Sequence, residues 1–145
     1  MVLSLPIARR LRNAGLSWTP QRGDRFVVAD RDMDDEVFVL SDMTIEVHRY
    51  PGGPVFGFNG TTEWALDSVD QQDALWIPAE HQLRELLAGA FVRLERYDDA
   101  HRVVFSLAGV EKSVVAPIVA DAYGLALLES LRVYPDANFA AGLVE

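Results

Sequence analysis

The fold class is decided by residues 44–66, which read TIEVHRYPGGPVFGFNGTTEWAL. Apolar and polar residues alternate in the first part of this stretch, as they do in a half-buried strand. Gly52-Gly53 and Asn59-Gly60 are typical of two-residue hairpin turns, and each lies between two such segments. We therefore expect an antiparallel meander with the strands Thr44–Tyr50, Pro54–Phe58 and Thr61–Leu66.

Helices and further strands are expected on both sides of this meander. The expected helices span Ser4–Ala14, residues 78–88 and residues 117–132, and the further strands span Arg25–Ala29, Glu36–Leu40, Phe91–Tyr97, His101–Leu107 and Val110–Val115. This order does not repeat the strand–helix–strand unit of a parallel sheet. The sequence therefore predicts one α+β domain over residues 1–145, an antiparallel, meander-rich sheet with three helices packed on it. The last helix is apolar on most sides, so we expect it to be the most buried.

Composition narrows the class of protein further. The chain has 145 residues, half of them hydrophobic, which suits one folded domain and argues against disorder. Cysteine is absent, which excludes disulfides, thiolate metal sites and a cysteine nucleophile. No apolar run approaches the length of about 18 residues that a membrane span needs. We expect a soluble, cytoplasmic protein with no membrane partner.

The net charge of the chain argues against a nucleic-acid partner. The chain carries 13 Lys and Arg residues against 22 Asp and Glu residues, a net charge of −9. A nucleic-acid backbone repels a chain this acidic unless a local basic patch offsets the repulsion. The one basic cluster, Arg9, Arg10 and Arg12 with Arg22 and Arg25 nearby, is interpreted as a solvated helix face. We expect no nucleic-acid partner.

Sequence motifs for cofactors and metals are missing. The chain has no phosphate-binding loop, dinucleotide-binding glycine pattern or zinc-binding H-E-x-x-H. Asp30, Asp32 and Asp34 have the spacing of calcium ligands, but Asp35 stands where a calcium loop needs Gly and Ser41 where it needs Glu. We therefore expect a solvated loop there, no metal, no cofactor and no binding of ATP.

The register set by the two glycine turns gathers a candidate site on one face of the meander. It places His48 opposite Gly57, Tyr50 opposite Val55, Gly57 opposite Thr62, and Val55 opposite Trp64. Gly57 leaves space beside His48, and Glu46 on the same face can fix the His48 tautomer. One interpretation is a polar pocket in which His48 and Glu46 are the weak catalytic candidates and Tyr50, Gly57, Thr62 and Trp64 bind the ligand. The other is a half-buried sheet face on which glycine relieves crowding.

Four parts of the chain resemble a family of small uncharacterised actinobacterial proteins, some of which are labelled pilus assembly protein CpaE. These parts are Asp42–His48, Gly57–Ser68, Trp76–Pro78 with Gln82–Leu87, and Ala120–Leu128. The resemblance covers nearly the whole chain. It implies a bacterial, actinobacterial protein and a pilus or secretion accessory role, and it brings no catalytic residues with it.

Three functions remain open from the sequence. The first is a binding or accessory domain without catalysis, whose partner is a protein or a small molecule. The second is a small hydrolase- or isomerase-like enzyme that uses His48 and Glu46, and the third is the pilus or secretion accessory role. We also expect a homodimer, because the apolar last helix and a tail over residues 135–145, with Phe139, Leu143 and Val144, exceed what one domain buries easily. That tail is interpreted as loose, as an interface segment, or as folded over its own core.

Overall fold

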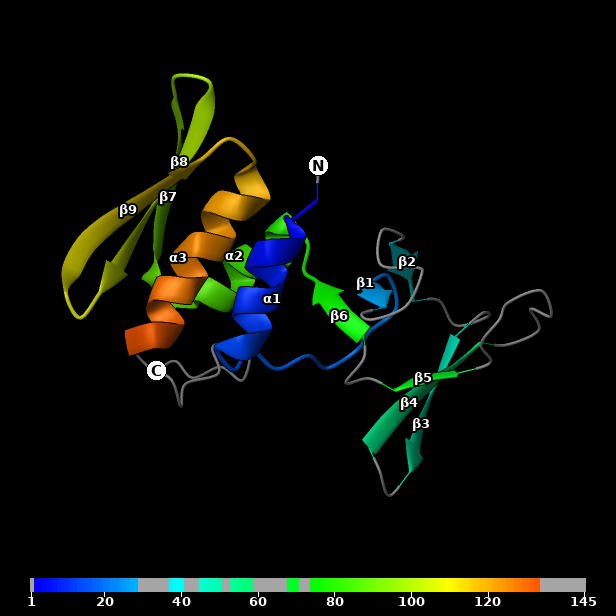
Figure 1. Cartoon of the computed structure of the whole chain (residues 1–145). Coiled ribbons are helices and arrows are strands. Elements are labelled where there is room, and N and C mark those ends of the chain that lie inside the picture. The colour runs from blue at the N-terminus through cyan, green and yellow to red at the C-terminus, as the bar shows by residue number, and fades with distance from the viewer. Residues whose placement is uncertain are drawn as a thin grey trace. The chain divides into compact units, whose positions relative to one another are not determined.

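The chain folds into two compact units (Figure 1). Unit 1 comprises Met1–Ser17 and Pro78–Glu145, and unit 2 comprises Trp18–Ile77. The computed structural model describes residues 2–28, 37–40, 45–50, 53–58, 68–70 and 74–133. Within these residues, no helix is long and apolar enough to cross a membrane.

Unit 1 contains the three helices and one antiparallel sheet. Its elements are α1 (Leu5–Asn13), α2 (Glu80–Leu87), the short 3₁₀ helix η2 (Ala88–Ala90), β7 (Phe91–Tyr97), β8 (Ala100–Leu107), β9 (Val110–Ala116) and α3 (Val119–Val133). The strand order is β7-β8-β9. Tyr97 pairs with Ala100 and Leu107 with Val110, so each turn has two residues. Asp98 and Ala108 take the positive φ angles, 54° and 51°, that such tight turns require.

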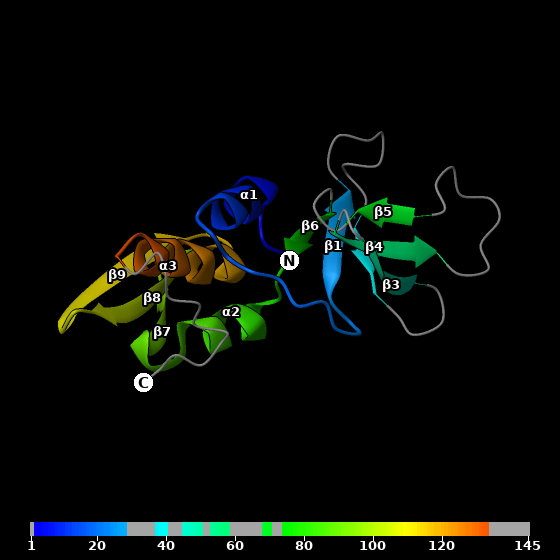
Figure 2. The ribbon, with the colours of Figure 1, turned by 90° about the horizontal axis from the view of Figure 1, so that it is seen from below.

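Helix α3 is the centre of unit 1. Ten of its 15 residues are buried, against two in α1 and three in α2, which confirms that the last helix is the most buried. It packs on β8 and β9, and both α1 and α2 pack on it (Figure 1, Figure 2). The sequence of α3 is therefore apolar on most sides because other elements of unit 1 pack on several sides of this helix.

Helix α1 approaches α3 closely at a glycine. A Cβ atom added to Gly124 would lie 2.8 Å from Ile7 Cγ2 and 3.0 Å from Leu3 Cδ1. Both distances are shorter than ordinary van der Waals contact, so only glycine fits here without a shift of the Ile7 and Leu3 side chains. The same seam has a polar anchor, because the Ser4 backbone N–H donates to Asp121 Oδ1 at 2.8 Å and the Ser4 hydroxyl donates to Oδ2 at 2.5 Å.

Unit 2 contains two antiparallel sheets of three strands. One has the order β2-β1-β6 and the other the order β3-β4-β5. The strands are β1 (Arg25–Val28), β2 (Phe38–Val39), β3 (Ile45–Tyr50), β4 (Gly53–Phe58), β5 (Ser68–Asp70) and β6 (Ala74–Ile77). A small core forms on the first sheet from Phe26, Val28, Leu40 and Ala74, with Trp18 and Phe38 packed against it.

The α+β class is confirmed, with antiparallel sheets and three helices. The expectation of one domain over residues 1–145 stays a prediction. The sequence missed β6, because Ala74–Ile77 is a short apolar run without alternation, and the structure pairs it with β1. The expected strand Thr61–Leu66 and the expected tail over residues 135–145 lie outside the described residues.

Replacing Gly124 tests the close approach of α1 to α3. We expect Gly124→Val to lower the free energy of unfolding by about 1–3 kcal/mol, because the added carbons overlap Ile7 and Leu3. Urea denaturation followed by circular dichroism measures this change. The matched control is Gly89→Val, since a Cβ at Gly89 meets no atom within 4 Å. Equal stability of the two variants would contradict the packing described here.

Candidate functional site

The β3–β4 hairpin has a different register from the one expected. Tyr50 pairs with Gly53, His48 with Val55, and Glu46 with Gly57, so the pairing is shifted by two residues. The expected register was wrong because it pairs Pro51 with Pro54, and neither residue has an N–H to donate to the ladder. In the observed register Tyr50 and Gly53 close the turn, so the next pair, Arg49 and Pro54, is a non-hydrogen-bonded pair in which Pro54 needs no N–H toward β3.

The shift keeps the candidate residues on one face but changes their neighbours. Successive positions of a strand belong to opposite faces of its sheet, so a shift of two leaves Glu46, His48, Tyr50 and Gly57 at positions of one face. Gly57 lies opposite Glu46, and Val55, not Gly57, lies opposite His48, so the expected pairing of His48 with Gly57 was wrong. Thr62 and Trp64, the other two expected ligand-binding residues, lie outside the described residues.

Strand β5 adds two polar residues to this hairpin face. Ser68 lies opposite Gly57 and Asp70 lies opposite Val55. One row of the ladder is therefore Glu46, Gly57 and Ser68, and the next is His48, Val55 and Asp70. Sequence reasoning missed Ser68 and Asp70 because it placed the third strand at Thr61–Leu66. The polar–apolar–polar order of residues 68–70 is the signal that marks them.

A second candidate surface is the face of the β7-β8-β9 sheet that points away from the helices. Val103, Phe105 and Leu107 of β8 are buried and share the helix side, and the Phe91 ring centroid lies 5.8 Å from that of Tyr123 in α3. The register places the alternate positions on the other side of the sheet. This outer face carries Arg93, Glu95, Tyr97, Arg102, Glu111, Ser113 and Val115.

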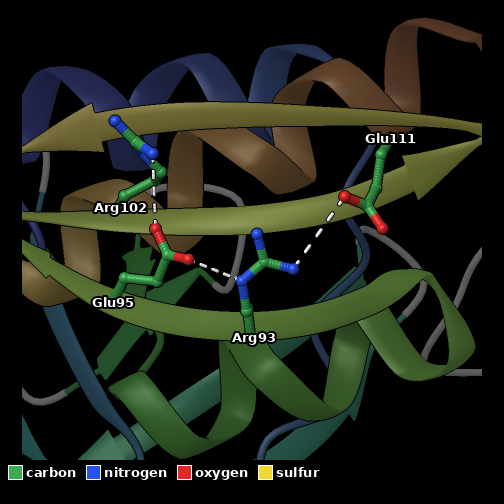
Figure 3. A network of polar contacts seen from close by, with 4 residues as sticks. All are labelled: Arg93, Glu95, Arg102 and Glu111. Carbon is green, nitrogen blue, oxygen red and sulfur yellow. Dashed lines mark hydrogen bonds and ion pairs between the residues drawn. The ribbon is translucent and has the colours of Figure 1, made fainter.

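A chain of ion pairs links the three strands across the outer face (Figure 3). Arg93 Nε lies 2.5 Å from Glu95 Oε2, Arg102 Nη1 lies 3.4 Å from Glu95 Oε1, and Arg93 Nη1 lies 3.9 Å from Glu111 Oε1. The hydrogen bond from Arg93 holds the pKa of Glu95 below its usual value, and Glu95 in turn raises the pKa of Arg93. Arg93 and Glu111 are more than half exposed, so these ion pairs contribute little to the free energy of folding.

Arg102 also stacks on an exposed tyrosine. Its guanidinium carbon lies 4.2 Å from the centroid of the Tyr97 ring, the geometry of a cation–π interaction. Tyr97 keeps 45% of its surface exposed, and Val115, which pairs with Arg102 across the sheet, keeps 41%. Arg102 Nε is buried and has no hydrogen-bond partner in the part of the chain that the structure describes. The outer face thus presents a held aromatic ring, an apolar side chain and charges of both signs.

Neither similarity to known proteins nor a cluster of metal-binding side chains points to further functional residues in the described part of the chain. No protein-family model, curated protein or solved structure matches the chain. Among the described residues, no three His, Asp or Glu side chains lie together as metal ligands would.

The lowered pKa of Glu95 predicts how it titrates. We expect Glu95 to titrate below the usual value of 4.5, so its contribution to stability is complete at neutral pH and is lost as the pH falls through that lowered pKa. Arg93→Ala should return the Glu95 pKa toward 4.5, because Arg93 is its main hydrogen-bond donor. An NMR titration of the side-chain carboxyl measures both values. Arg132→Ala, which removes the ion pair with Glu129 on α3, is the control and should leave Glu95 unchanged.

Proposed function

We propose that the protein is a binding or accessory module without catalysis, and that it binds a partner protein through the outer face of the β7-β8-β9 sheet. The observation that carries the proposal is the stacking of Arg102 on the half-exposed ring of Tyr97. Tyrosine and arginine are the residue types most often found as the energetic anchors of protein interfaces. Here both are held in place before a partner arrives, which lowers the entropy lost on binding.

The charges of this face favour a protein over a nucleic acid. Glu95 and Glu111 stand among Arg93 and Arg102, so each basic group has a carboxylate within 4 Å. A phosphate backbone would meet these carboxylates as well as the arginines. A polar protein surface can match both signs of charge.

Recovery of a partner from the native host tests the proposal. We expect a tagged copy of the chain to recover one protein other than itself in a fixed ratio. Tyr97→Ser and Val115→Ser should each reduce that recovery at least about tenfold, since loss of an interface anchor costs about 2 kcal/mol or more. Val133→Ser on α3 removes a similarly exposed apolar side chain and should have no effect. Equal recovery by all three variants would show that the partner does not bind at this face.

A hydrolase- or isomerase-like activity is the second candidate. The register supports it by placing Glu46, His48, Ser68 and Asp70, all residue types used in acid–base catalysis, on one hairpin face. A panel of ester and phosphoester substrates tests it with His48→Asn as the variant and His81→Asn, on the exposed side of α2, as the control. Turnover by the control but not by the variant would support catalysis at this face, and no turnover by the unaltered chain would contradict it. A pilus or secretion role rests on the family resemblance alone, and the identity of the recovered partner bears on it directly.

A further inference from the structure

We propose that two copies of this chain pair edge to edge through β7, antiparallel and centred on Leu94. The proposal does not rest on the proposed function, because the backbone groups at the edge of the sheet carry it, although the charges that it matches, Arg93 and Glu95, also belong to the outer face. It also moves the expected homodimer contact from the last helix to the sheet edge.

Strand β7 is the end strand of its sheet and carries exposed apolar residues. It stands at the end of the order β7-β8-β9, and among the described strands only β8 pairs with it. Val92 is 40% exposed and Leu94 is 39% exposed. An edge strand of this kind offers backbone N–H and C=O groups to another strand.

The hairpin geometry shows which backbone groups point outward. Tyr97 and Ala100 close a two-residue turn, and such a turn is closed by a hydrogen-bonded pair. Because hydrogen-bonded and non-hydrogen-bonded pairs alternate along an antiparallel ladder, Glu95 and Arg93 also direct their backbone groups toward β8. The N–H and C=O groups of Leu94 and Arg96 therefore point away from the sheet.

Pairing about Leu94 uses these free groups and matches the charges. Leu94 would lie opposite the partner's Leu94 in a hydrogen-bonded pair. Arg93 would lie opposite the partner's Glu95, and Glu95 opposite the partner's Arg93, by the two-fold symmetry. These are non-hydrogen-bonded pairs, in which the side chains of opposite residues are closest. Each Glu95 would then have three arginines near it: Arg93 of its own strand, Arg102 of β8 and the partner's Arg93.

Neighbouring registers and the other edge are less favourable. Moving the centre to Arg93 or to Glu95 would set two arginines or two glutamates directly opposite each other, and like charges there are destabilising. On β9, pairing about Ser113 would set Glu111 opposite Val115 and Lys112 opposite Val114, with no opposite charges matched. The bulge between Phe91 and Arg93 interrupts the regular ladder at the start of β7, so the seam is short and favours one register.

Charge reversal on the full chain tests the pairing. Sedimentation equilibrium at micromolar concentration should show a mass approaching twice 16.1 kDa. Arg93→Glu or Glu95→Arg should each raise the dimer dissociation constant at least about tenfold, because each sets like charges opposite one another. Glu129→Arg on α3 is the matched control, an exposed reversal that also breaks an ion pair, and it should not change the dissociation constant.

Two rescue experiments separate interface effects from folding effects. The double variant Arg93→Glu/Glu95→Arg restores opposite charges and should dimerise like the unaltered chain. An equimolar mixture of the Arg93→Glu chain with the Glu95→Arg chain should form a heterodimer, since one then presents two carboxylates and the other two guanidiniums. A monomeric unaltered chain, a dimer insensitive to the single reversals, or a mixture that stays monomeric would each overturn the proposal. These experiments measure the mass of the dimer. Their outcome is therefore distinguishable from the reduced recovery of a partner protein expected for Tyr97→Ser and Val115→Ser.

Discussion

Ten buried residues of α3 hold unit 1 together, because β8, β9, α1 and α2 all pack on this one helix. Leu127 and Leu131 are at most 2% exposed, and burial of a leucine side chain contributes about 1.5–3 kcal/mol. A helix that other elements cover on several sides needs small residues where one of these elements comes close to its backbone. Gly124 is this residue where α1 crosses, and Asp121 receives the two hydrogen bonds of Ser4 at the same seam.

The packing of α3 on one side of the β7-β8-β9 sheet has consequences for the other side. Val103, Phe105 and Leu107 are buried against the helix layer, while Tyr97 and Val115 keep over two fifths of their surface exposed. Ion pairs link Arg93, Glu95 and Arg102 on that outer face. Among the described strands only β8 pairs with β7, and Leu94 on this edge strand is 39% exposed. The outer face and the β7 edge meet at Arg93 and Glu95, and α3 covers neither of them in the described part of the chain.

Periodicity and turn residues predicted the helices and the β7-β8-β9 meander, because those signals are local. Ser4, Pro6 and Gly15 bound the first helix, and Asp98-Asp99 and Ala108-Gly109 separate the strands. The candidate site was harder to predict, because register depends on which residues can donate to the ladder. Pro51 and Pro54 change it by two positions, and the partner strand is Ser68–Asp70. The network of Arg93, Glu95 and Arg102 could not be predicted either, because it needs the exact register of β7 on β8.

Amide hydrogen exchange at rising protein concentration tests most directly whether β7 and β9 differ as edges. The amides of Leu94 and Arg96 point outward from β7, and by the same alternation those of Glu111, Ser113 and Val115 point outward from β9. The account predicts that Leu94 and Arg96 exchange more slowly as the concentration rises, while the three β9 amides stay fast. Exchange at Leu94 and Arg96 that is as fast as on β9 at every concentration would contradict it.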